Sequence, residues 1–175
     1  MLRSHNDRKG RVNMLWRFIT IGLLSLAIQV ASADTLTGVV VGVADGDTVT
    51  LLDAQKQQHK IRLAGIDAPE KVQAFGSKST ANLGRLAFNK NAVADCPKTD
   101  RYGRLVCKIT VAGQDVGLQQ VKDGMAWWFR NYSKEQSPQD QADYEQAETM
   151  AKLRRFGLWS DTNPVPPWEW RKLGR

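Results

Sequence analysis

The sequence predicts an α+β protein in which five short strands form a small closed barrel, accompanied by about three helices. Short stretches rich in β-branched and apolar residues, separated by polar turns, indicate the strands. Apolar residues at helical spacing, mostly in the second half, indicate the helices. The chain has 175 residues, of which 42% are hydrophobic and 25% are charged. These values fit one folded domain and exclude a disordered chain or a protein with many membrane spans.

The first 33 residues have the pattern of an export signal. Five Lys or Arg residues precede an uncharged stretch at 18–33, whose most apolar part is shorter than the roughly 20 residues needed to span a bilayer. The Ala-Ser-Ala at 31–33 matches the small-x-small rule for signal peptidase cleavage. We expect cleavage after residue 33 and a periplasmic or secreted protein. An uncleaved membrane anchor is the alternative, and either Met1 or Met14 is the start.

Three segments are therefore expected: a signal peptide at 1–33, a folded domain at 34–160 and a tail rich in Pro and Trp at 161–175. Loss of the signal peptide lowers the formal charge from +7 to +3, so net charge alone is weak support for a nucleic-acid partner. The two histidines lie far apart in sequence and only two cysteines are present, which excludes an HExxH or Cys₄ zinc site.

The strands alternate with turns that the sequence marks. Residues 44–47 contain an Asp-Gly pair, which favours a hairpin turn because Gly tolerates a positive φ. In the third strand apolar or small residues alternate with polar ones, with Gly65 near its end. The expected strands cover residues 35–43, 48–52, 59–66, 92–96 and 104–111.

The helices are placed by their faces and their ends. Residues 77–89 place Leu83, Leu86 and Ala87 on one face, and a short helix from Val116 ends near Gly124. A third helix begins with a Ser cap at 137, Pro in the first turn and an acidic residue that suits the helix dipole. We expect it to run to about Phe156 and to stop at Gly157. The tail contains three prolines and cannot be helical throughout.

Three short segments carry the candidate chemistry: DGDT at 45–48, RLAGIDAPE at 62–70 and DRYGR at 100–104. Each segment alone is a weak signal, because an Asp-Gly pair is usually only a turn and a lone arginine usually forms a surface ion pair. Together and in this order they resemble the staphylococcal nuclease (thermonuclease) family, with later matches at 124–126 (GMA) and 157–159 (GLW). The resemblance implies a five-stranded OB barrel with helices, which agrees with the strand pattern.

The resemblance implies a Ca²⁺ site formed by Asp47, Asp67 and the carbonyl oxygen of Ala68, with Asp45 beside it in a supporting role. Carboxylates and carbonyls are the hard oxygen ligands that Ca²⁺ prefers. Two carboxylates leave most of roughly 6–8 coordination positions to water and substrate, so we expect modest affinity. The alternative is that these aspartates only form turns and caps.

The resemblance also assigns Glu70 as the general base, and Arg62 and Arg104 as catalytic phosphate-binding residues. An ionised carboxylate can orient or deprotonate a water molecule. Guanidinium groups match phosphate oxygens in geometry and charge. One geometric difficulty concerns Arg62 and Asp67, which lie five positions apart and would occupy opposite faces of a regular strand. The strand must therefore bend, with Gly65 as a plausible bulge, or Asp67 must lie beyond it.

Further residues are expected around the substrate. Arg101 and Tyr102 adjoin Arg104 and suit contact with a phosphate or stacking on a base. Tyr132 lies where the family lines its nucleotide groove. For Trp127 and Trp128, a place in the barrel core is favoured over a place in that groove; the tryptophans of the tail have no assigned role.

Cys96 and Cys107 are expected to form a disulfide, because an even pair in an exported chain favours one. The bridge would flank the segment that contains Arg104, and two inert buried thiols are the alternative.

Two functions follow as hypotheses. The first is an exported, Ca²⁺-dependent nuclease that hydrolyses DNA and/or RNA with little base specificity, and acts as a monomer without a protein partner or lasting membrane association. The second is a non-catalytic OB module that binds nucleic acid. The presence of all five expected acidic and basic site residues favours the enzyme.

Overall fold

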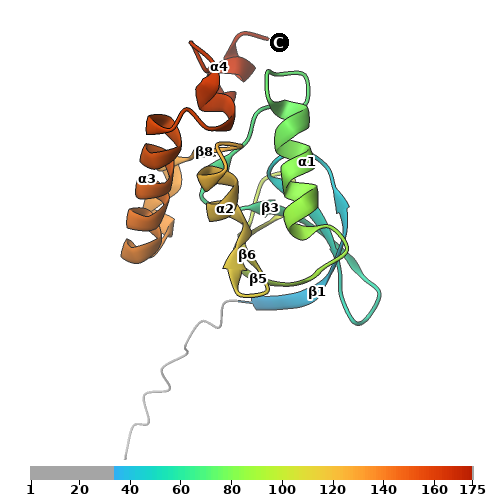
Figure 1. The fold of residues 1–175 in the computed structure, drawn as a ribbon. Helices are drawn as coiled ribbons and strands as arrows, with labels where there is room; N and C mark the ends of the chain where they lie inside the picture. The colour runs from blue at the N-terminus through green and yellow to red at the C-terminus, as the bar shows by residue number, and fades with distance from the viewer. Residues whose placement is uncertain (1–33, 175) are drawn as a thin grey trace, which may run out of the picture. The chain divides into compact units, whose positions relative to one another are not determined.

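The computed structural model describes residues 34–174, and the expected signal peptide lies outside the described residues. Within the described range, no helix is both long and apolar enough to cross a membrane. The α+β prediction is confirmed: a small barrel carries the helices (Figure 1).

Five strands close the barrel: β1 (Asp34–Val43), β2 (Thr48–Leu52), β3 (Gln58–Leu63), β5 (Asn91–Thr99) and β6 (Leu105–Val111). They are joined in the order β3-β2-β1-β5-β6, and a parallel pairing of β3 with β6 completes the circle. A bulge in β1 between Val40 and Gly42 shifts its register against β2, as expected of a strand that must bend within a closed sheet. A short strand β7 (Gln114–Asp115) pairs with the end of β6.

The barrel is filled by the alternate residues of each strand, as period-two patterning requires. Val49, Leu51, Ile61 and Leu63 are at most 2% exposed. On β5 the inward positions carry small residues: Ala92, Ala94 and Cys96. Small side chains there leave room for the larger ones opposite and for the helix that covers the barrel.

The hairpin turn at 44–47 is confirmed, but the expected reason for its glycine is wrong. Gly46 does not have a positive φ. A Cβ atom at this position would instead lie 1.9 Å from Ser79 Oγ and 2.7 Å from Ala68 Cβ. Glycine is required here because the turn packs directly against α1 (Gly76–Ala87) and the 66–70 segment.

The predicted third strand breaks earlier than expected. β3 ends at Leu63, Ala64 and Gly65 form a turn with Gly65 at φ +75°, and β4 (Ile66–Asp67) begins a separate two-stranded sheet with β8 (Trp127–Trp128). A left-handed backbone conformation is readily adopted only by glycine. Gly65 is thus a turn residue rather than a bulge, and it separates Arg62 and Asp67 onto two different strands.

Three helices lie side by side beside the barrel, with α2 (Val116–Lys122) between α1 and α3 (Pro138–Leu153) (Figure 1). Helix α1 buries Leu83 and Ala87, as predicted. Asp115 caps α2 through the backbone N–H of Leu118. The predicted start of α3 is confirmed, since the Ser137 hydroxyl accepts a hydrogen bond from Asp140 N at 3.0 Å.

Helix α3 ends at Leu153, three residues before the predicted end, because Arg155 already adopts a positive φ of 54°. Gly157 has another role: its backbone meets that of Gly124, and a Cβ there would lie 2.1 Å from Gly124 O. The backbone N–H of Leu158 donates to that same oxygen at 2.8 Å. The two late glycine motifs therefore form one close backbone crossing. Two 3₁₀ helices, Arg130–Glu135 and Gly157–Ser160, flank α3.

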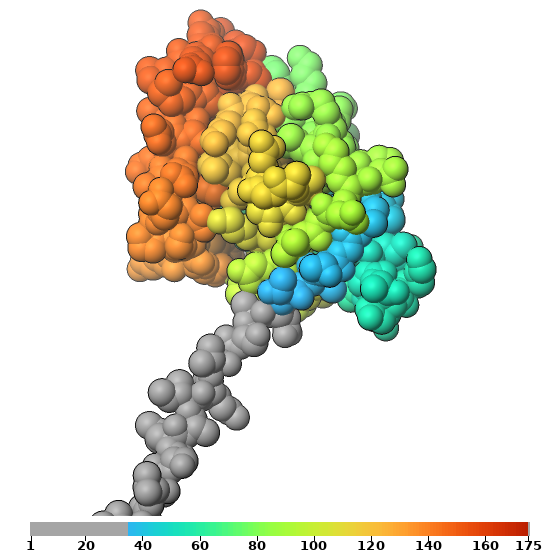
Figure 2. Space-filling view, turned by 60° about the horizontal axis from the view of Figure 1, so that its bottom comes forward, coloured from blue at the N-terminus to red at the C-terminus, as the bar shows by residue number. Residues whose placement is uncertain are grey.

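The tail is partly helical, as its prolines allow. A short helix, α4 (Pro167–Lys172), follows an extended run with Pro164 and Pro166. It lies at the far end of the molecule from the β1 strand that begins the described chain (Figure 1). Figure 2 views the β1 end: β1 (blue) lies next to the segment that joins β2 and β3 (teal), and α3 (orange) lies on the opposite side of the view.

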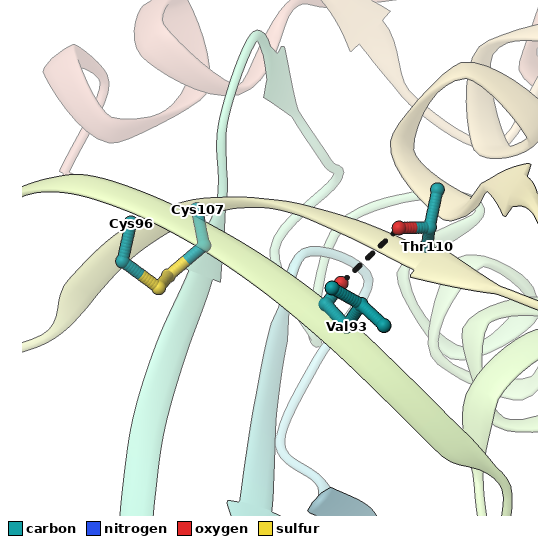
Figure 3. The surroundings of a disulfide bond; sticks show 4 residues. All are labelled: Val93, Cys96, Cys107 and Thr110. Carbon is teal, nitrogen blue, oxygen red and sulfur yellow. Dashed lines mark hydrogen bonds between the residues drawn. A yellow bond between two sulfur atoms is a disulfide. The ribbon is translucent and has the colours of Figure 1, made fainter. Parts of the chain in front are cut away.

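The expected disulfide is present between Cys96 and Cys107, which face each other on β5 and β6 (Figure 3). Both residues are buried. A hydrogen bond from Thr110 Oγ1 to Val93 O at 3.3 Å ties the same two strands further along (Figure 3). The bridge closes the hairpin whose tip carries the DRYGR segment.

Candidate active site

One cavity of ≈ 630 Å³ brings the three motif segments together. Every residue that the sequence assigned to catalysis, metal binding or substrate binding lines it: Asp45, Asp47, Arg62, Asp67, Ala68, Glu70, Arg101, Tyr102, Arg104 and Tyr132. These residues come from the first hairpin, the β3–β4 region, the β5–β6 hairpin and the 3₁₀ helix before α3.

Asp47 is held by the hairpin turn and by the segment after β4. Its backbone N–H donates to Asp45 Oδ1 at 3.1 Å, and its own carboxylate accepts from the hydroxyl of Thr48 at 3.1 Å and from the backbone N–H of Ala68 at 3.0 Å. The residue is 5% exposed. Two hydrogen bonds therefore fix the direction of this buried carboxylate, while Asp45 bonds the backbone of the same residue.

Arg62 lies between the two predicted metal-binding carboxylates. Its guanidinium contacts Asp47 Oδ2 at 2.5 Å and Asp67 Oδ1 at 3.2 Å, and it donates to the carbonyl of Ile66 at 3.2 Å. The turn at Gly65 makes this possible, because it returns the chain toward the end of β3. Of the two alternatives for the spacing of Arg62 and Asp67, the second therefore holds: Asp67 lies beyond β3, on β4.

Burial and charge act in opposite directions in this cluster. Burial raises the pKa of Asp67, which is 1% exposed, and its arginine partners only partly offset that rise. Burial and the neighbouring charge of Asp47 likewise raise the pKa of Asp45. For Arg62, burial favours a lower pKa, but Asp47 and Asp67 outweigh it and the pKa is raised. Arg62 is therefore a permanent cation among the carboxylates.

Glu70 follows Pro69, and its backbone N–H donates to the Gln73 side chain at 3.1 Å. Its side chain is 39% exposed, in contrast to the buried Asp47 and Asp67. The Glu70 carboxylate is thus the most accessible of these three acids. That exposure is what a group needs if it is to meet a water molecule and a substrate.

Arg104 is held at the end of the β5–β6 hairpin by Asp100. The Asp100 carboxylate accepts from Arg104 Nε at 2.8 Å and from the backbone N–H groups of Arg104 and Tyr102, each at 2.9 Å. The Arg104 Nη1 lies 3.5 Å from the hydroxyl of Thr48, which itself bonds Asp47. Asp100 thus holds one edge of the Arg104 guanidinium, and the residue also lines the cavity.

Aromatic and basic side chains surround the opening. The Tyr102 ring is 69% exposed, with the guanidinium carbons of Arg101 and Arg104 at 4.9 and 5.6 Å from its centre. Tyr132 is half exposed and has Lys98 Nζ 4.5 Å from its ring centre. Such rings suit stacking on bases. Trp127 and Trp128 are each 6% exposed, so they belong to the interior, which the sequence favoured over a place in the groove.

Sequence reasoning missed two basic side chains that line this cavity. Lys98 lies at its edge in an ion pair with Glu135 at 2.6 Å. Arg171, from α4, contacts both Asp67 and Glu70. The position of Lys98 near the end of a predicted strand and two residues before DRYGR was an available signal. For Arg171, nothing in the sequence pattern indicated a place in the site.

The described residues contain no cluster of three or more His, Cys, Asp or Glu side chains placed to hold a metal ion. Two buried carboxylates, Asp47 and Asp67, do share one guanidinium beside a solvent-connected cavity. Their oxygens suit a hard cation that keeps many water ligands. The donor chemistry therefore fits Ca²⁺, with most of the coordination supplied from outside the protein.

Comparison of the sequence with known proteins shows the family of the chain. The family model described as staphylococcal nuclease homologue matches residues 60–161. The chain belongs to the staphylococcal nuclease family. The match contains the 62–70 and 100–104 segments and the glycine crossing, whereas the DGDT turn and α4 lie outside it.

Relatives extend over most of the chain. A protein of Haemophilus influenzae named uncharacterized endonuclease is 39% identical over 150 residues, which cover 86% of this chain and 81% of that protein. The micrococcal nuclease of Shigella flexneri is 38% identical over 159 residues, covering 86% and 88%. An uncharacterized endonuclease of Escherichia coli O157:H7 is 35% identical over 156 residues, covering 89% and 97%.

Proposed function

We propose that this chain is an exported, Ca²⁺-dependent nuclease that hydrolyses phosphodiester bonds of DNA and/or RNA. The observation that carries the proposal is the meeting of three acidic and two basic motif residues in one cavity. The names of the relatives support a nucleic-acid substrate. The remaining details rest on the chemistry of the residues themselves.

In this mechanism Glu70 accepts a proton from the water molecule whose oxygen bonds to phosphorus, while the P–O bond to the leaving group breaks and the leaving oxygen takes up a proton from solvent. Its partly exposed carboxylate lines the cavity that also holds the two motif arginines. Arg62 and Arg104 donate hydrogen bonds to the phosphate oxygens as negative charge grows on them. Removing one preorganised donor of this kind typically costs about 10²–10³ in rate.

Asp47 and Asp67, with the carbonyl of Ala68, would hold Ca²⁺. When bound, the ion would supply positive charge beside the phosphate and lower the cost of charge build-up there. Arg62 orients both carboxylates before any ion arrives, because its contacts to Asp47 and Asp67 hold the two side chains on either side of it.

Substrate contacts outside the reacting centre come from Arg101, Tyr102 and Tyr132. Stacking is tolerant of sequence because every base has a π-face. We therefore expect little base specificity, and we expect a monomer without a protein partner. Export is supported by the pattern of residues 1–33, which lie outside the described residues, and by the Cys96–Cys107 bridge.

The deciding experiment is hydrolysis of plasmid DNA, single-stranded DNA and RNA by the purified chain, with Ca²⁺ and with excess chelator. Cleavage that requires Ca²⁺ would support the proposal. Binding of all three nucleic acids without cleavage would favour the alternative, a non-catalytic OB module. The intact set of Asp47, Arg62, Asp67, Glu70 and Arg104 favours the enzyme.

A further inference from the structure

The tail of the chain returns to the candidate active site. Gln73, which also bonds the backbone of Glu70, donates to the carbonyl of Val165 at 2.6 Å. Trp168 packs against Phe129 and Trp127, with ring centres 5.4 and 6.4 Å apart. Pro167, the first residue of α4, is buried. These contacts hold α4 and the residues before it against the 66–75 segment, β8 and Phe129, next to the cavity.

In this position of α4, the Arg171 guanidinium contacts the carboxylates of Asp67 and Glu70. Its Nη2 lies 2.7 Å from Asp67 Oδ2 and its Nη1 lies 3.3 Å from Asp67 Oδ1. The same Nη1 lies 2.8 Å from Glu70 Oε1. One planar fork therefore joins a buried carboxylate to a more exposed one, a geometry that guanidinium allows and a lysine ammonium does not reproduce.

Among the residues that the structure describes, Arg171 is the one side chain that bonds the Glu70 carboxylate. Asp67 has a second cationic partner in Arg62, whereas within the described range Arg171 is the single cationic partner of Glu70. The Glu70 side chain is 39% exposed, so packing alone holds it weakly. The direction of this carboxylate therefore depends on α4.

We propose that Arg171 is a positioning residue for Glu70, supplied by the C-terminal helix α4. By binding Asp67 with one side of its fork, Arg171 fixes the place where the other side holds Glu70. The inference rests on the proposed role of Glu70 as the base. It adds a residue outside the range matched by the family model, which ends at 161.

The test uses Arg171→Met in the full chain, because Met keeps the apolar stem while removing the charge and the fork. Lys172→Met is the matched control: it is the next residue on α4, 68% exposed, and pairs with Glu169 rather than with the site. With DNA and Ca²⁺ saturating, Arg171→Met should lower kcat by about 10–100-fold, the scale of small positioning errors, and change KM little. Lys172→Met should keep both constants.

A double variant separates positioning from other roles. If Arg171 acts through Glu70, adding Arg171→Met to Glu70→Gln should lower kcat no further, because residues that act as a unit are not additive. Arg171→Lys should recover part of the lost kcat, since an ammonium can pair with one carboxylate but not hold both. A raised KM with unchanged kcat would instead mean direct contact with substrate phosphate and would overturn the proposal.

Two further results would also overturn it: wild-type kcat in Arg171→Met, or an equal loss on the wild-type and Glu70→Gln backgrounds. Urea unfolding supplies a readout independent of activity. The shifts in midpoint caused by Arg171→Met and Glu70→Gln should be less than additive in the double variant, and strict additivity would refute the contact. Inactivity of the wild-type chain itself would defeat the proposed function, while this unfolding cycle would still decide the contact.

Discussion

Opening the Cys96–Cys107 bridge should both destabilise the protein and loosen the hairpin that carries Arg104. The two cysteines lie on neighbouring antiparallel strands, with a sequence separation of 11. The β5–β6 register shifts between Asp95 and Lys98, so the ladder is irregular beside the bridge. The closed segment contains Asp100 and Arg104. The bridge therefore joins β5 and β6 where their regular pairing is interrupted. Arg104 lies within the segment that the bridge closes.

The expected size of the effect follows from the loop that the bridge closes. Counting both cysteines, the loop has about 12 residues, for which the chain-entropy model gives roughly 3 kcal/mol. For a domain of this size, that corresponds to a fall in Tm of about 10 °C. In Cys96→Ser/Cys107→Ser the buried hydroxyls add a cost of about 1–3 kcal/mol each when unpaired. Reduction of the wild-type bridge avoids that extra cost.

The assay compares urea unfolding of oxidised wild type, reduced wild type and the double serine variant, with turnover measured well below each midpoint. Reduced wild type should lose about 3 kcal/mol of unfolding free energy, and the serine variant should lose more. Positioning errors near 1 Å can cost about 10²-fold in rate, so turnover should also fall. An unchanged midpoint on reduction would refute the stability argument. Lower stability with full turnover would leave the bridge without a part in positioning Arg104.

Three further predictions concern single side chains. Glu70→Gln should lower kcat by about 10²–10⁴, the typical contribution of a general base, as measured at saturating Ca²⁺. Asp47→Asn should weaken Ca²⁺-dependent activity and Ca²⁺-dependent thermal stabilisation together, because both follow one affinity; unchanged dependence in both would relocate the metal site. Burial favours a higher pKa for Asp100, but its hydrogen bonds from Arg104 and Tyr102 outweigh this and lower it. A depressed carboxylate pKa stabilises the fold above the unfolded value of about 3.9 and loses that contribution as pH falls through the folded value. Unfolding midpoints of Asp100→Asn should therefore lie below wild type at pH 7 and converge with it in acid.

The barrel could be predicted from the sequence because its strands follow local rules. Period-two patterning and turn residues placed β1, β2 and β6 to within a residue. The errors arose where tertiary contacts decide the backbone. Gly46 is needed for its close approach to Ser79, and the end of α3 is set at Arg155, which no glycine rule marks. Close approach between distant segments has no local signature.

The candidate site was predicted on other grounds. Each motif segment alone indicates only a turn or a strand end, and it was their order along the chain, which resembles the staphylococcal nuclease family, that indicated the chemistry. The spacing of Arg62 and Asp67 even required a break in the chain between them, and Gly65 was named as the residue that permits it. What the spacing left open was the kind of break: a turn to a new strand rather than a bulge in the old one.

Arg171 lay beyond such reasoning because its place depends on a contact about a hundred residues away along the chain, and its own surroundings indicate only a short helix. The prolines before α4 fix an extended approach, but not its destination. That destination is set by Trp168 against Phe129 and by Gln73 against the carbonyl of Val165. The side-chain oxygen of Gln73 also accepts a hydrogen bond from the backbone N–H of Glu70. One residue thus holds both the segment that carries the candidate base and the segment that carries its arginine partner, so the geometry of this acid depends on the docked tail as well as on the barrel.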